Sequence, residues 1–278
     1  MNKVKFKIWA TLIWGYKYSF QNIPSICQIG WLPMFIVCVG FLSVPYFVAI
    51  GYESLTSAYL FPASFAASYF AVPWHRKILL NEKNVEQIRV RRPELIYFGL
   101  LLFMNYFDVA IELLATFLEV STDNVIFQTS MWTSMVLILV IVSMMVPAIA
   151  IDDRQMTLGR AWGLWRGNRI RFLFFILLSG VVYGTLWTLL VKTNSFVSFR
   201  LADMINVDYG NISFYGADFL KFMFSYGVTS PILTVLMFLL FSSFVGALSI
   251  SYAGIARNAM NTDQRYEPPK AMGHRLTA

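Results

Sequence analysis

The stretch MWTSMVLILVIVSMMVPAIAI, residues 131–151, decides the fold of this chain. It carries no charged side chain. As a helix rising about 1.5 Å per residue, it is long enough to cross the roughly 30 Å hydrocarbon core of a bilayer. Backbone polar groups cannot stay unbonded in hydrocarbon, so a run of this kind must be helical. The stretch therefore predicts a membrane-spanning helix.

Five other runs have the same length and apolar character. The whole chain is 58% hydrophobic and 13% charged, whereas soluble domains carry about 25% charged residues. We therefore predict an all-α fold, an integral membrane six-helix bundle forming one domain over residues 1–257, followed by a polar cytoplasmic tail, 258–278. The predicted spans are 27–50, 55–74, 95–118, 131–151, 172–191 and 231–256.

Lysine and arginine are distributed unevenly between the two sides of these spans. Nineteen lie before the first span, after the second and fourth, and in the tail, and three lie on the other side. Positive residues stay on the cytoplasmic side, so both termini are expected there. The basic residues punctuate apolar segments, which favours anionic lipid headgroups over nucleic acid as their partners. The candidate headgroup contacts are Arg76, Lys77, Arg160, Arg166, Arg169 and Arg171.

Two stretches have the pattern of amphipathic helices lying in the cytoplasmic interface, with the apolar side in the acyl boundary and the basic side at the headgroups. The alternative is that they are short cytoplasmic helices packed on protein. Between 192 and 230, the longest connection on the outer side, aromatic residues predict short helices that lie on the outer membrane face or cap the bundle. The apolar faces of the two amphipathic stretches are Trp9, Leu12, Ile13, Tyr16 and Phe20 in the first, and Leu158, Ala161, Trp162 and Trp165 in the second, which covers 157–168.

Asn105, Asp108 and Glu112 share one face of the third predicted span. Carboxylates in hydrocarbon are costly, and they usually face a cavity or a partner. This face is therefore the candidate site for a cation or proton relay, or for a lipid headgroup. The alternative is structural, because both carboxylates lie in the outer half of the span, where they can meet water or pair with Lys192 or Arg200.

Small residues recur at helix-packing spacing in two spans, at Ala63, Ala67 and Ala71 and again at Ser242 and Gly246. This spacing lets two backbones approach closely. Packing within the chain and self-association both fit the pattern.

The sequence contains no motif of a known catalytic or cofactor-binding type. Its two histidines, His75 and His274, are far apart, and Cys27 and Cys38 have no metal-binding spacing. We therefore expect no enzymatic activity, no cofactor and no metal.

Three short motifs stand out: Trp74-His75-Arg76, Leu79-Leu80-Asn81-Glu82 and Leu158…Ala161-Trp162…Arg166-Gly167-Asn168. At these motifs the chain resembles a group of bacterial inner-membrane proteins that are similar to the membrane domain fused to some glycerophosphodiester phosphodiesterases. The resemblance implies a six-helix bundle in the inner membrane and leaves function open, and no segment resembles the phosphodiesterase domain itself.

Two functions are consistent with these patterns. The first is a non-enzymatic scaffold, assembly factor or accessory subunit of a membrane complex, with other membrane subunits or a second copy as partner. The alternative is a protein that transports or binds a lipid or small solute through the polar face of the third span.

Overall fold

The computed structural model describes residues 7–49, 60–82, 90–117, 125–153, 157–205 and 217–262. Within these ranges the chain is helical and has no strand, which confirms the predicted all-α class. The helices are α1 (Ile8–Gln21), α2 (Ile23–Ala49), α3 (Leu60–Leu80), α4 (Arg92–Phe117), α5 (Val125–Ala150), α6 (Leu158–Leu164), α7 (Arg169–Met204) and α8 (Ala217–Thr262).

Four of the described helices are long and apolar enough, by length and composition, to cross a membrane. They are α2, α5, α7 and α8, with apolar windows at Ile23–Gly40, Phe127–Ala150, Arg169–Leu201 and Thr229–Ala256. They correspond to the first, fourth, fifth and sixth predicted spans. The second and third predicted spans fall on α3 and α4, which are helical but do not belong to this group of four.

Helices α7 and α8 are longer than predicted. They have 36 and 46 residues, or about 54 and 69 Å of helix. The prediction of short helices between 192 and 230, on the outer membrane face or capping the bundle, was wrong for the described part of that segment, because 192–204 continues α7 and 217–230 begins α8. Buried hydroxyls join the two extensions: the Ser198 and Thr229 oxygens lie 2.7 Å apart. At the other end, the first five residues of the predicted tail, 258–262, still belong to α8.

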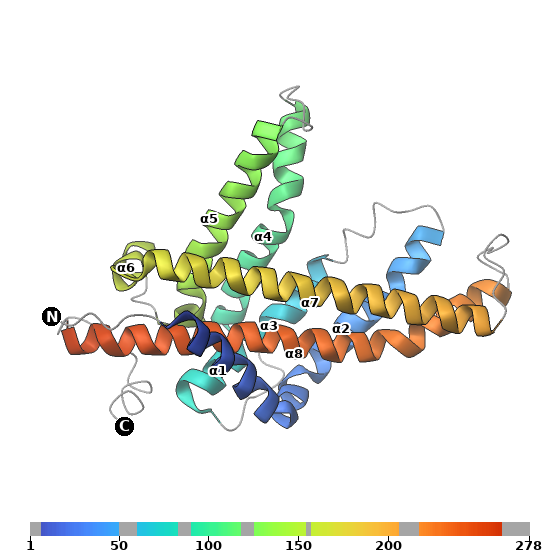
Figure 1. Ribbon diagram of the computed structural model, residues 1–278, viewed down its shortest axis with the longest axis horizontal. Coiled ribbons are helices and arrows are strands. Elements are labelled where there is room, and N and C mark those ends of the chain that lie inside the picture. Colours follow the sequence, from blue (N-terminus) through green and yellow to red (C-terminus); the bar gives the residue numbers. More distant parts are fainter. Residues whose placement is uncertain are drawn as a thin grey trace.

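Helix α8 is central to the packing of the bundle. It contacts α1, α2, α3, α5, α6 and α7. Figure 1 shows α7 and α8 side by side along the long axis, with the α4–α5 hairpin rising away from them and α1 crossing α8. Helix α3 is central in a second way, because it packs against α2, α4, α5 and α8.

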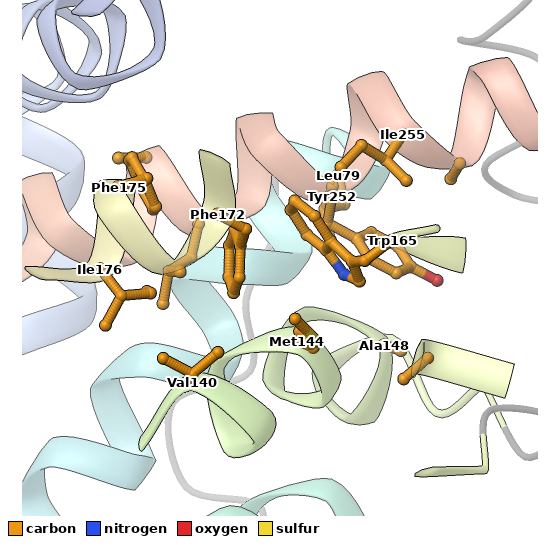
Figure 2. Close-up of a cluster of buried hydrophobic side chains, with 14 of the residues drawn as sticks. Leu79, Val140, Met144, Ala148, Trp165, Phe172, Phe175, Ile176, Tyr252 and Ile255 are labelled. Carbon is orange, nitrogen blue, oxygen red and sulfur yellow. The ribbon is translucent and has the colours of Figure 1, made fainter. Parts of the chain in front are cut away.

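One hydrophobic cluster joins α5, α6, α7 and α8 near α6. The ring of Trp165 lies 3.8 Å from that of Phe172, measured between centroids. Figure 2 shows these rings with Tyr252 above Met144 and Val140 of α5. All five side chains are buried, so this cluster fixes the α4–α5 hairpin to the α7–α8 pair.

Three residues with positive φ end helices at this same side of the bundle. Asn81 (φ 58°) follows α3, and Asp152 (φ 55°) follows α5. Gly167 (φ 88°) lies in the turn between α6 and α7. Left-handed residues after a helix redirect the chain and let its last carbonyls be bonded. Gly167 thus helps the chain turn from α6 into α7.

Candidate functional site

Four consecutive residues near the end of α3, Trp74 to Lys77, each hydrogen-bond with another part of the chain. Trp74 is fully buried, and its indole Nε1 donates to the backbone carbonyl of Ser242 in α8 at 2.9 Å. A buried indole N–H needs such a partner. The ring also lies 5.7 Å from that of Tyr18 in α1, so Trp74 connects three helices.

His75 is fully buried beside α8. Its Nδ1 lies 2.6 Å from the hydroxyl of Ser249, and that hydroxyl is 3.0 Å from the carbonyl of Val245. The Ser249 hydroxyl therefore links the His75 ring to the backbone of α8, while Nε2 has no hydrogen-bond partner among the described residues. The ring of Tyr97 in α4 lies 6.0 Å away.

Arg76 and Lys77 point to other partners. The Arg76 guanidinium pairs with Glu82 through two nitrogens, one of them Nε at 3.0 Å, and it also donates to the carbonyl of Ala150 at the end of α5. Lys77 donates to the Ser25 hydroxyl of α2 at 2.5 Å. Two of the six candidate headgroup contacts are therefore used to join helices.

The polar face predicted on the third span lies on α4. Asn105 is exposed, and its Nδ2 donates to the hydroxyl of Ser64 in α3 at 2.7 Å. Asp108 and Glu112 belong to α4 by their backbone, and their side chains lie outside the described residues. The one described member of the face thus contacts a neighbouring helix.

The other candidate arginines lie around α6. Both Nε and Nη2 of Arg169 donate to the carbonyl of Trp162, and its guanidinium stacks 4.1 Å from the centroid of the Trp162 ring. Arg166 is exposed, whereas Arg160 and Arg171 are half-buried. Arg169 therefore stabilises the α6–α7 turn.

The two small-residue patterns have different surroundings. In α3, Ala71 is buried, while Ala63 and Ala67 are half-buried beside the buried Ser64 and Ser68. In α8, a Cβ built on Gly246 would lie 3.5 Å from the carbonyl oxygen of Gly15 in α1, and Ser242 accepts from Trp74. These α8 residues thus lie at contacts with α1 and α3.

Sequence reasoning missed the role of Trp74 and His75 as buried links to α8. The buried serine at position 249 of α8 gave a signal for His75, since a buried hydroxyl needs a partner, whereas Trp74 bonds the backbone carbonyl of Ser242, which no side-chain pattern marks. Among the described residues, no group of three or more His, Cys, Asp or Glu side chains is arranged to hold a metal ion. A scan against protein-family models and searches of curated proteins and of solved structures found no match for this chain.

Proposed function

We propose that this chain is a six-span protein of a bacterial inner membrane, with both termini in the cytoplasm, and that it acts without catalysis as a scaffold, assembly factor or accessory subunit of a membrane complex. In this arrangement α2, α3, α4, α5, α7 and α8 all cross the bilayer. Helices α1 and α6 lie at its cytoplasmic side.

The charge distribution supports counting α3 and α4 as spans. At 21 and 26 residues, they are about 32 and 39 Å long, enough for a core of roughly 30 Å. If neither crossed, the six basic residues from Arg76 to Arg92 would lie on the outer side. That placement would leave 13 basic residues on the cytoplasmic side and 9 on the outer side, against the preference of such residues for the cytoplasm.

The observation that carries the functional proposal is the use of polar groups at the end of α3. His75, Arg76 and Lys77 bind Ser249, Glu82 with Ala150, and Ser25, respectively. A catalytic site needs acid, base or nucleophile groups converging on a space where a reacting atom can sit. Here these groups are directed at neighbouring helices, so they position the bundle and leave its outer faces for interaction.

Those outer faces are extensive. Only 17% of the α7 window is buried, compared with 61% of the α8 window. In a membrane complex, an accessory subunit presents such faces to lipid and to neighbouring subunits. Packing, polar contacts and lipid, rather than a hydrophobic driving force, decide which helices associate there.

Extraction of the tagged full chain from its native membrane in a gentle detergent tests this proposal. We expect a companion membrane protein at a fixed molar ratio, and we expect cross-linking in intact membranes before extraction to give the same pair. A multi-pass protein of similar size and charge, carrying the same tag, is the control. A chain that is monomeric both after cross-linking and after gentle extraction contradicts the proposal.

A further inference from the structure

We propose that the outward face of α1 is a lipid-binding surface, inserted among the acyl chains of one leaflet and holding an anionic phospholipid headgroup at Lys17. We call this surface the α1 lipid face. It is formed by Trp9, Ile13, Trp14, Lys17 and Phe20.

The depth at which α1 contacts α8 is the first argument. A Cβ built on Gly15 would lie 2.7 Å from the Cβ of Ala247 and 2.8 Å from the carbonyl oxygen of Ser243, so the helices touch backbone to backbone here. The apolar window of α8 ends at Ala256. Ala247 and Ser243 precede this end by about 14 and 20 Å of helix. The middle of α1 is therefore beside the apolar part of α8 and not beyond its end.

The sides of α1 have separate surroundings. Thr11, Leu12, Gly15 and Ser19 are buried, and they form the side that faces α8. The opposite side exposes large apolar groups to whatever surrounds the bundle at this depth. The exposed fractions are 66% for Trp9, 63% for Ile13, 57% for Trp14 and 57% for Phe20.

Lipid is the occupant that this position favours. A surface that lies beside the apolar part of a spanning helix, and points away from the bundle, meets acyl chains. In a soluble protein the same four side chains would form an exposed patch that calls for a protein partner. The expectation of a helix lying flat in the interface is thereby refined, because contact with Ser243 requires α1 to reach into the leaflet.

Lys17 gives the surface its charge preference. It lies two residues from Gly15, is exposed, and has its ammonium 5.3 Å from the centroid of the Trp14 ring. It forms no ion pair with a described residue. An ammonium at this depth extends its aliphatic stem toward the headgroups, where a lipid phosphate supplies the missing negative charge. We infer an anionic phospholipid such as phosphatidylglycerol.

A depth measurement tests the inserted position. The full chain, with Cys27→Ser and Cys38→Ser, carries a nitroxide at Ile13→Cys and is reconstituted in vesicles of phosphatidylcholine and phosphatidylglycerol. We expect the label to collide with oxygen much more than with a water-soluble nickel chelate. The control label, at Gly159→Cys on α6, has open space around it and is expected to meet the chelate.

Two outcomes of this measurement overturn the proposal. Chelate access at position 13 equal to that at 159 places the α1 lipid face in water. A label that neither reagent reaches shows that protein, such as a second copy of the chain, covers the face. Both outcomes are independent of whether a companion subunit is found, so this inference and the scaffold proposal can fail separately.

Charge removal tests the headgroup contact. Lys17→Gln is compared with Lys192→Gln, which removes the same charge from an exposed position on α7. Binding of spin-labelled phosphatidylglycerol is measured in phosphatidylcholine vesicles. We expect Lys17→Gln to weaken it about fivefold, the factor for one basic residue at an anionic surface, and Lys17→Arg to preserve it. Equal effects of the two glutamine variants, or loss of binding in Lys17→Arg despite a native helical spectrum, overturn the headgroup contact.

Discussion

A single methyl group added at Gly15 tests the packing of α1 on α8. The new Cβ would lie 2.7 Å from the Ala247 Cβ and 2.8 Å from both the Ala247 nitrogen and the Ser243 carbonyl oxygen. Two of these three atoms belong to the α8 backbone, so no side chain can rotate away. To restore ordinary contact at 3.4–4 Å, the helices must separate by about 1 Å, a gap that forfeits a quarter to a half of the dispersion attraction between facing atoms.

The cost follows from these distances. Overpacking of this kind typically costs about 1–3 kcal/mol, while alanine in place of glycine inside a helix contributes about 1 kcal/mol of stability. Gly184→Ala in α7 isolates the second effect, because a Cβ there has open space around it. We therefore expect the free energy of unfolding of Gly15→Ala to fall about 1–3 kcal/mol below that of Gly184→Ala. Reversible unfolding in mixed micelles, followed by helical circular dichroism as the fraction of dodecyl sulfate rises, measures the difference.

If Gly15→Ala is as stable as Gly184→Ala, or more stable, the close approach of α1 and α8 is wrong. Equal stability could also arise if the two helices repack locally around the new methyl group, and a measurement of the distance between α1 and α8 distinguishes the two explanations. A disulfide engineered between α1 and α8 should form in the parent chain and form more slowly with alanine at position 15.

Three further predictions each concern a substitution of one residue. Replacing Asn105 with Leu removes the bond to Ser64 and should cost about 0.6 kcal/mol, the average for a hydrogen bond between membrane helices, in the same unfolding assay. Ser198→Ala removes the hydroxyl that lies 2.7 Å from the buried hydroxyl of Thr229, and we expect a loss of about 1 kcal/mol, with Thr193→Ala at an exposed site of α7 as the neutral control. A cysteine at Glu82 should react with a membrane-impermeant maleimide in inside-out vesicles and stay unreactive in intact spheroplasts; the reverse pattern excludes α3 as a span.

The positions of the helices along the chain could be predicted from the sequence, but the contacts between the helices could not. Uncharged runs such as 131–151 fix where a spanning helix must be, because hydrocarbon leaves the backbone no other conformation. They do not fix where a helix stops outside the bilayer. In the described part of 192–230, the chain continues as α7 and α8, and the buried hydroxyl pair of Ser198 and Thr229 stabilises the extension. Such pairing depends on residues 31 positions apart, which no local pattern indicates.

The polar face predicted on the third span, now α4, shows the same contrast between a position that could be predicted and a contact that could not. A face containing Asn105 could be predicted from spacing alone, but its hydrogen bond to Ser64 could not, because it depends on how α3 and α4 pack. Gly15 gave no signal of its own, since a glycine in an amphipathic stretch is ordinary. Its importance comes from the residues of α8 that it meets.

The positive charges near the ends of the spans differ in use, although the sequence presents them alike. Arg76 and Arg169 donate hydrogen bonds to carbonyls and a carboxylate of the same chain, whereas Lys17 is exposed on α1. Counting such residues predicts a side of the membrane, because the translocation preference acts on charge alone. It does not predict lipid binding, which requires a donor that the fold leaves unused. Among the positions that the structure describes, Arg76 and Lys77 at the end of α3 are bonded within the chain, and the exposed Lys17 of α1 is the position where we propose headgroup binding.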